Sequence, residues 1–252
     1  MDRPIPGRQY DFTAPSVVHF GWGRRSELAA VVRSVAGADC RRALVVCGSK
    51  TLAVAPVWHE LITALAASGI PVAAMISTPR EPTVDDVDAA VETFAGVGAG
   101  RGDVVLAVGG GSAIDLAKAS AAMVTQTASQ QIRDYLEGIG RGLTLDAAPL
   151  PVVALPTTGG TGTEATRNAV ITASDPVCKK SLRSLSLVPK AVLIDPELGV
   201  TVSPQTTAWS GMDAITQLVE SYVSCRRSSV PQALAREALP GAWSSLPVVV
   251  RN

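Results

Sequence analysis

The stretch Val104–Ala119, VVLAVGGGSAIDLAKA, constrains the fold of this chain more than any other. It begins with an apolar run typical of a buried strand, continues into three glycines, and ends with apolar residues at helical spacing. A helix that follows a strand so directly has first-turn backbone N–H groups without helical partners, and its dipole favours an anion there. The stretch therefore predicts a phosphate-binding turn.

The glycine turn matches neither common phosphate-binding fingerprint. The pattern GxGxxG would need a glycine where Ile114 stands, and the pattern GxxxxGK[ST] does not occur. Gly109, Gly110, Gly111 and Ser112 are therefore compatible with an ordinary tight turn, although three glycines also allow a ligand to approach the backbone closely. Asp115 follows in the helix and is a candidate cofactor-binding residue; the alternative is that it caps the helix or offsets its dipole.

Strands and helices alternate along most of the chain, which predicts an α/β fold with a parallel sheet covered on both faces. We expect strands at 17–20, 43–46, 71–76, 103–108, 152–155, 169–172 and 191–194, and helices at 25–35, 57–67, 84–94, 113–124, from 204 onward and at 230–239. The pattern becomes helical after Asp195-Pro196. We therefore predict an α/β domain over residues 1–196 and the beginning of a helical domain over 197–252.

The composition excludes several functional classes. The 22 basic and 22 acidic side chains balance and form no basic tract, which argues against nucleic-acid binding. The sequence contains no run of about 18 apolar residues, so it predicts no membrane-spanning helix. Its first residues include no apolar segment of the kind that a signal peptide has. The 4 cysteines form no CxxC pair, which argues against a zinc ribbon and suits a reducing cytoplasm.

A second polar, glycine-rich loop follows the strand expected at 152–155. Ligands of open α/β sheets bind beyond the carboxyl ends of the strands, which is where this loop lies. The hydroxyl groups of Thr157, Thr158 and Thr161 could contact a phosphate, a ribose or an amide. A mobile surface loop is the alternative, but two such loops after successive strands favour one shared nucleotide cleft.

Asp213 and Gln217 are the candidate metal ligands in the helical part. They are four residues apart, so both lie on one face of the expected helix and could meet one ion. An ordinary hydrogen-bonded pair is the alternative. His19 and His59 are the only histidines, and no Ser-His-Asp or Cys-His arrangement is evident, so we assign no catalytic residue.

Six segments, in this order and spacing, resemble the iron-containing alcohol dehydrogenase family over nearly the whole chain. They are FGWGR at 20–24, PTVDDV at 82–87, VGGGSAIDLAKA at 108–119, LPTTGGTGTEAT at 155–166, LVPKAVLIDPEL at 187–198 and GMDAITQLVESYVS at 211–224. The resemblance implies the fold shared with dehydroquinate synthase: a parallel-sheet NAD(P)-binding domain and an all-helical domain, with a divalent metal, commonly iron and alternatively zinc, between them.

The resemblance also implies hydride transfer between an alcohol and NAD or NADP, with the metal acting as a Lewis acid. It assigns the pyrophosphate to Gly109, Gly110, Gly111 and Ser112, the phosphate and nicotinamide site to Thr157, Thr158 and Thr161, the ribose to Lys179, and the metal to Asp213. The expected partner is a small alcohol or aldehyde, not a nucleic acid or a membrane. Assembly as a homodimer is left open.

Three features depart from the family pattern. Ser49 stands near the position where many NAD-using relatives carry an acidic residue, so a 2′-phosphate would meet no repulsion and NADP is compatible. Gln217 replaces a histidine ligand, and its amide is a weaker ligand for iron or zinc. The chain ends at Asn252, before the family's remaining histidine ligands.

These departures predict a truncated chain with an incomplete metal site and an uncovered apolar surface over Trp209–Leu239. The leading hypothesis is a family oxidoreductase that binds NAD(P). The alternative is an inactive nucleotide-binding remnant or a partner subunit. A metal-independent cyclase of the related sugar-phosphate type is a third reading, which the GMDA segment disfavours.

Overall fold

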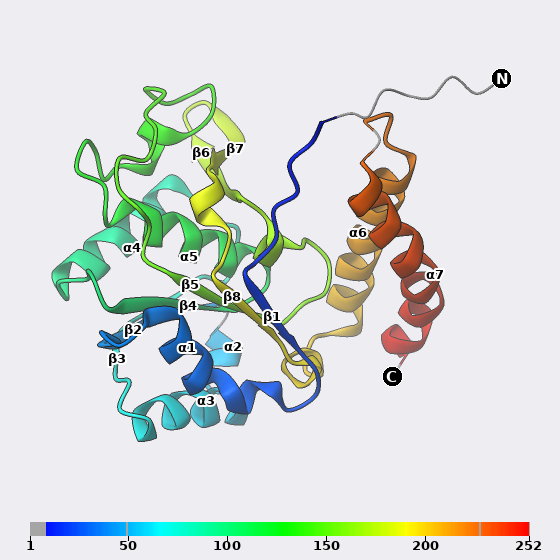
Figure 1. Ribbon diagram of the computed structural model, residues 1–252, viewed down its shortest axis with the longest axis horizontal. Helices are drawn as coiled ribbons and strands as arrows, with labels where there is room; N and C mark the ends of the chain where they lie inside the picture. The colour runs from blue at the N-terminus through cyan, green and yellow to red at the C-terminus, as the bar shows by residue number, and fades with distance from the viewer. Residues whose placement is uncertain (1–8, 49, 227, 252) are drawn as a thin grey trace. The chain divides into compact units, whose positions relative to one another are not determined.

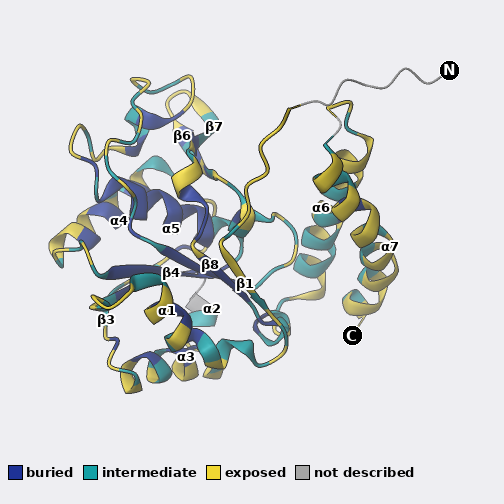
Figure 2. Ribbon diagram, in the orientation of Figure 1, coloured by how far each residue is buried: buried dark blue, intermediate teal, exposed yellow. Residues whose placement is uncertain are grey.

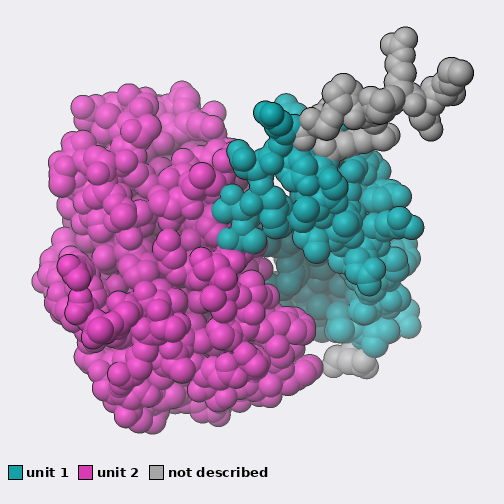
Figure 3. Space-filling model, in the orientation of Figure 1, with its two compact units in different colours: residues 1–14, 158–162, 201–252 teal, residues 15–157, 163–200 magenta. Residues whose placement is uncertain are grey.

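The computed structural model describes residues 9–48, 50–226 and 228–251, with the side chain of Lys50 left out. It divides into two compact units, which Figure 3 colours separately. We call residues 15–157 and 163–200 the sheet unit, and residues 1–14, 158–162 and 201–252 the helical unit.

The sheet unit contains a six-stranded sheet in which every pairing is parallel. Its spatial order is β1 (Val17–Phe20), β8 (Ala191–Ile194), β5 (Val152–Pro156), β4 (Asp103–Gly109), β2 (Arg42–Cys47) and β3 (Val72–Ser77). Strand β4 lies inside the sheet and is buried along its whole length, as its unbroken apolar run indicates. The predicted parallel α/β fold is confirmed.

Helices cover both faces of this sheet, as Figure 1 shows. Leu44 and Val46 of β2 pack in one core with α4 (Val84–Gly96) and α5 (Gly111–Met123). The alternate residues Ala43 and Val45 pack in a second core with α1 (Leu28–Ala36) and α3 (Pro56–Ala67). Successive side chains of a strand point to opposite faces, so each buried strand contributes to both cores.

Helix α5 is unusual because residues 113–123 are all buried (Figure 2). Most of them are alanine or a larger apolar residue, and a helix that is apolar on every side belongs in a core. Two charged residues, Asp115 and Lys118, are buried with them. Because burying a charge is costly unless it is paired or hydrogen-bonded, these two residues require an explanation.

The strand expected at 169–172 forms, but outside the parallel sheet. It is part of β6 (Asn168–Ser174), which pairs with β7 (Val177–Arg183) in an antiparallel hairpin. The sequence did not indicate β7, because VCKKSLR is too polar to give an apolar run. The shorter elements of the sheet unit are η1 (Arg24–Glu27), α2 (Lys50–Ala53), η2 (Ile132–Tyr135), η3 (Thr163–Ala165), η4 (Leu185–Leu187) and η5 (Pro196–Gly199).

The helical unit is built around α6 (Pro204–Val223) and α7 (Ser229–Arg251). Helix α6 begins with Ser203, whose hydroxyl accepts a hydrogen bond from the Thr206 N–H, and with Pro204 in the first turn. Helix α7 is longer than the expected 230–239, because it continues through Pro240 and Pro247. Within the described helices, none has the length and apolar character that a membrane span requires.

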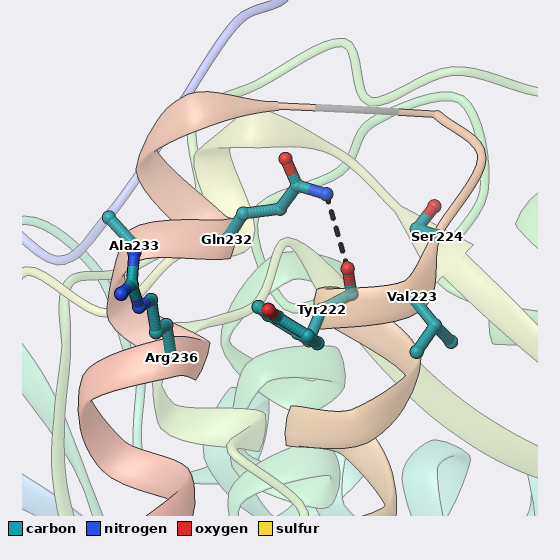
Figure 4. A pocket seen from close by; sticks show the side chains of 6 residues that line it. All are labelled: Tyr222, Val223, Ser224, Gln232, Ala233 and Arg236. Carbon is teal, nitrogen blue, oxygen red and sulfur yellow. Dashed lines mark hydrogen bonds between the residues drawn. The ribbon is translucent and has the colours of Figure 1, made fainter.

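The helix pair carries the apolar surface that the sequence predicts. Within the predicted range its exposed apolar side chains include Trp209, Met212, Tyr222 and Leu234, and Trp243 extends the surface further along α7. Where α6 ends and α7 begins, the helices enclose a depression of about 500 Å³, shown in Figure 4. Its lining residues are Tyr222, Val223, Ser224, Gln232, Ala233 and Arg236, and the Gln232 amide donates to the Tyr222 carbonyl at 3.2 Å. None of these is a predicted site residue.

Candidate functional site

The glycine turn joins β4 to α5 and leaves the start of the helix open. Gly110 precedes the first helical residue, and no side chain caps the helix there. The Gly110 carbonyl accepts hydrogen bonds from the N–H groups of Ala113 and Ile114, at 3.0 and 3.2 Å. The N–H groups of Gly111 and Ser112 precede these two and point out of the first turn, which is the arrangement that holds anions at helix N-termini.

The turn packs so tightly that a side chain would not fit at its first residue. A Cβ on Gly109 would lie 2.8 Å from the Ala113 Cβ in the following helix. The backbone of α5 is thereby brought directly against the end of β4. Only glycine allows this approach, which places the helix start at the carboxyl edge of the sheet.

Backbone hydrogen bonds to β4 continue one residue past the ends of β2 and β5. The Gly48 N–H donates to the Val108 carbonyl at 2.8 Å, and the Thr157 N–H donates to the Gly109 carbonyl at 3.0 Å. Thr157, the first residue of the second polar loop, is therefore held beside the glycine turn. This proximity follows from the sheet, in which β4 and β5 are neighbours, and it concerns Thr157 alone among the loop residues named by the sequence.

Behind the turn lie three ionisable groups from α5 and η3. Burial lowers the pKa of the Lys118 ammonium to about 8, although the negative charges of Asp115 and Glu164 oppose the change. Burial raises the pKa of the Asp115 carboxyl to about 7, against the opposing effects of Lys118 and the Val170 N–H. Burial also raises the pKa of Glu164. One Asp115 oxygen, Oδ1, has no hydrogen-bond partner.

The other predicted cofactor residues are distributed more widely. Lys179 lies on β7, where its exposed ammonium is 2.5 Å from the Glu81 carboxylate. The side chain expected to contact the ribose therefore forms an ion pair with Glu81. Thr158 and Thr161 belong to the helical unit, whereas Thr157 belongs to the sheet unit. Ser49 lies outside the described residues.

Asp213 and Gln217 lie on one face of α6, as their spacing predicts, and they bond to each other. The Gln217 side-chain amide donates to the Asp213 carboxylate at 3.1 Å and to the Gly160 carbonyl at 3.2 Å. The group turned toward Asp213 is thus an N–H donor, which cannot bind a metal. Within residues 9–48, 50–226 and 228–251, no three His, Cys, Asp or Glu side chains form a metal cluster. The described residues therefore fit a hydrogen-bonded pair better than a metal site.

Sequence reasoning overlooked three residues that shape this region. Lys118 could have been recognised as a charged residue within an otherwise apolar and small-residue helix. Gly48 lies at the end of β2, but only its contact with β4 reveals why a glycine is needed there. Glu81 carries no local signal, because its partner Lys179 is far away in the sequence.

Comparisons with known proteins match this arrangement. The family model described as iron-containing alcohol dehydrogenase matches residues 15–196. The long-chain-alcohol dehydrogenase 1 of Geobacillus thermodenitrificans is 33% identical over 94% of this chain and 57% of its own length. The 4-hydroxybutyrate dehydrogenase of Cupriavidus necator is 33% identical over 93% of this chain and 58% of its own. The chain thus spans less than two thirds of these curated relatives.

A solved structure matches this chain in three dimensions over nearly its whole length. The sulfoacetaldehyde reductase of Bifidobacterium kashiwanohense, crystallised in complex with NAD+, is 29% identical to this chain with a TM-score of 0.86. The superposition covers 98% of this chain and 62% of that one. Both the sheet and the helices therefore have counterparts in a nucleotide-bound relative.

Proposed function

The chain belongs to the iron-containing alcohol dehydrogenase family, and we propose that its sheet unit binds NAD or NADP with the pyrophosphate at the glycine turn. The observation that carries this proposal is the uncapped start of α5 directly after β4. Gly109, Gly110, Gly111 and Ser112 supply backbone N–H groups there. An anion in this position completes hydrogen bonds that the helix itself cannot make.

The remaining nucleotide contacts are proposed on position and on family resemblance. Thr157 lies beside the turn, and Thr158 and Thr161 follow it in the polar loop. Lys179 would have to leave Glu81 to reach a ribose. Asp115, with its unpartnered buried oxygen, could accept a hydrogen bond from the cofactor, and Ser49 would leave room for a 2′-phosphate.

We further propose that the whole protein transfers hydride between an alcohol or aldehyde and this cofactor. Two named relatives are dehydrogenases of a long-chain alcohol and of 4-hydroxybutyrate, which supports an alcohol as the substrate class. The cysteine pattern supports a cytoplasmic setting. We divide the functions as a nucleotide-binding domain over residues 1–196 and a helical domain over 197–252.

A metal, when bound in this family, supplies the Lewis acid that polarises the reacting oxygen. The hydrogen bond between Gln217 and Asp213 does not fit that role, so we derive no step through a metal for these residues. The same bond favours a second candidate function, in which the chain binds nucleotide without turning over an alcohol. Metal analysis and alcohol oxidation with and without a chelator separate the two functions.

Titration of NADH and NADPH, followed by nicotinamide fluorescence, tests nucleotide binding, and the absence of saturation with both would refute it.

The Gly110→Asp and Gly110→Asn variants test where the nucleotide binds. Gly110 has the extended backbone of a helix N-cap, so both side chains should cap α5 and preserve stability. Only the carboxylate would repel the pyrophosphate. We expect affinity to fall about tenfold more with Asp than with Asn, because charge repulsion of about 1.4 kcal/mol corresponds to that factor.

A further inference from the structure

Lys118 is a fully buried cation whose hydrogen bonds are all to uncharged oxygens. Its side chain lies on α5 with 0% exposure. The ammonium nitrogen lies 2.9 Å from the Thr163 carbonyl, 2.8 Å from the Thr166 carbonyl and 3.1 Å from the Thr166 hydroxyl. An ammonium group has three N–H donors, and each of them finds an acceptor here.

These bonds hold one end of the polar loop that follows β5. The loop begins at Thr157, whose N–H is bonded to the Gly109 carbonyl at the end of β4. It ends at Thr163, whose carbonyl is bonded to Lys118 on α5. Both ends are therefore attached to the elements that flank the glycine turn. A methionine is similar in length to Lys118 but has no N–H donors, so what the lysine adds is its hydrogen bonds to Thr163 and Thr166.

The carboxyl groups nearest to this ammonium lie on two elements. Asp115 is one turn earlier on α5, and Glu164 is on η3 beside Thr163. Both favour the charged form of Lys118, while its burial opposes that form. The Thr163 and Thr166 carbonyl oxygens therefore complete the stabilisation of a cation that burial alone would disfavour.

We propose that Lys118 is a positioning residue that fixes the Thr163 end of the loop after β5, while the Thr157 end lies beside the glycine turn, so that turn and loop can contact one nucleotide. This inference rests on the proposed nucleotide binding. Its prediction is specific to the loop: without the ammonium, the hydrogen bonds at Thr163 and Thr166 are lost, while the glycine turn and its backbone bonds remain.

The Lys118→Met variant tests this inference, with Lys190→Met as a matched control because Lys190 is an exposed lysine of the same sheet unit. In Lys118→Met we expect NADH affinity to fall about tenfold, since hydrogen bonds of charged groups are strong. Amide hydrogen exchange should accelerate at residues 157–166 and stay unchanged elsewhere in the sheet unit. Lys190→Met should match the original protein in both measurements.

The pH profile adds a readout that a purely structural role would not move. Between pH 7 and pH 9, the original protein should lose NADH affinity as Lys118 loses its proton, since its pKa is about 8. Asp115 and Glu164 are the carboxyl groups facing it, and burial raises the pKa of both. Asp115, with a pKa of about 7, completes its own ionisation in the lower part of this range, so the loss that belongs to Lys118 is the one centred near pH 8. Lys118→Met should bind weakly and without this pH dependence.

If Lys118→Met does not fold, Thr166→Val removes one of the three acceptors of Lys118, together with the hydrogen bonds that this hydroxyl donates to the Thr163 and Asn168 carbonyls. It leaves both carbonyl acceptors of Lys118 in place and should give a smaller loss of affinity, about twofold to threefold, with the same local exchange. Equal NADH binding and equal exchange in the original protein and the variant would overturn the inference alone. Failure of the original protein to bind either nucleotide would overturn the proposed function and this inference with it.

Discussion

Gly48 and Gly109 lie against each other at the ends of the neighbouring strands β2 and β4. A Cβ on Gly109 would lie 2.7 Å from the Gly48 Cα, and a Cβ on Gly48 would lie 2.9 Å from the Gly109 Cα. Real Cβ atoms essentially never approach other atoms so closely. Two strand ends can meet in this way only when both residues lack side chains, and the contact sets where α5 begins.

Gly109→Ala should therefore destabilise the protein. The added methyl group meets backbone atoms of Gly48, which cannot move aside as a flexible side chain would. We expect the free energy of unfolding, measured by urea titration, to fall by about 1–3 kcal/mol, as in other overpacked sites. Gly96→Ala is the matched control, because nothing lies within 4 Å of the added Cβ at the end of α4. It should leave stability unchanged or raise it by up to about 1 kcal/mol.

Asp115→Asn should change how stability depends on pH. Burial raises the pKa of Asp115 from 3.8 to about 7, so between these values the native state holds a proton that the unfolded state releases. The native state thus binds more protons than the unfolded state, and stability falls as pH rises through this range. Asparagine resembles the protonated acid and carries no such dependence.

Urea titrations at pH 5 and pH 7.5 check the sign of this effect. Relative to Asp115→Asn, the original protein should lose stability between the two pH values. A difference between the proteins that stays constant with pH would show that the buried carboxyl does not titrate in this range.

Gln217→His should create a metal site that Gln217 does not make with Asp213. An imidazole and a carboxylate four residues apart on α6 can share one ion, and imidazole suits zinc. We expect Zn²⁺ at 100 times its dissociation constant to stabilise the variant by about 2.7 kcal/mol. The original protein should show no comparable gain.

Thermal unfolding with and without Zn²⁺, and then with a chelator, measures this gain. The double variant Asp213→Asn/Gln217→His is the control, since it keeps the imidazole and removes the charged partner. Equal stabilisation of the single and double variants would show that the ion binds elsewhere. Asp213 would then not be a metal ligand beside position 217.

The parallel sheet and its order of elements could be predicted from local patterns. The apolar runs of β4 and β5 and the helical spacing in α1, α3 and α4 are properties of neighbouring residues, so a sequence displays them directly. Prediction failed where the local signal was absent or misleading. Strand β7 gives no apolar run because Leu182 is its only buried residue, and α7 continues through Pro240 and Pro247, residues that usually end a helix.

The sequence by itself determined the strand, glycine turn and helix at 104–119 and the family to which they point, because chain neighbours alone form these features. Only the tertiary structure decided which atoms the functional side chains meet. Lys118 bonds to Thr163, 45 residues away, and the Gln217 amide bonds to Gly160, 57 residues away. Such contacts depend on how separate elements pack, and a hydrogen bond forms only when packing brings its donor and acceptor within about 3 Å of each other.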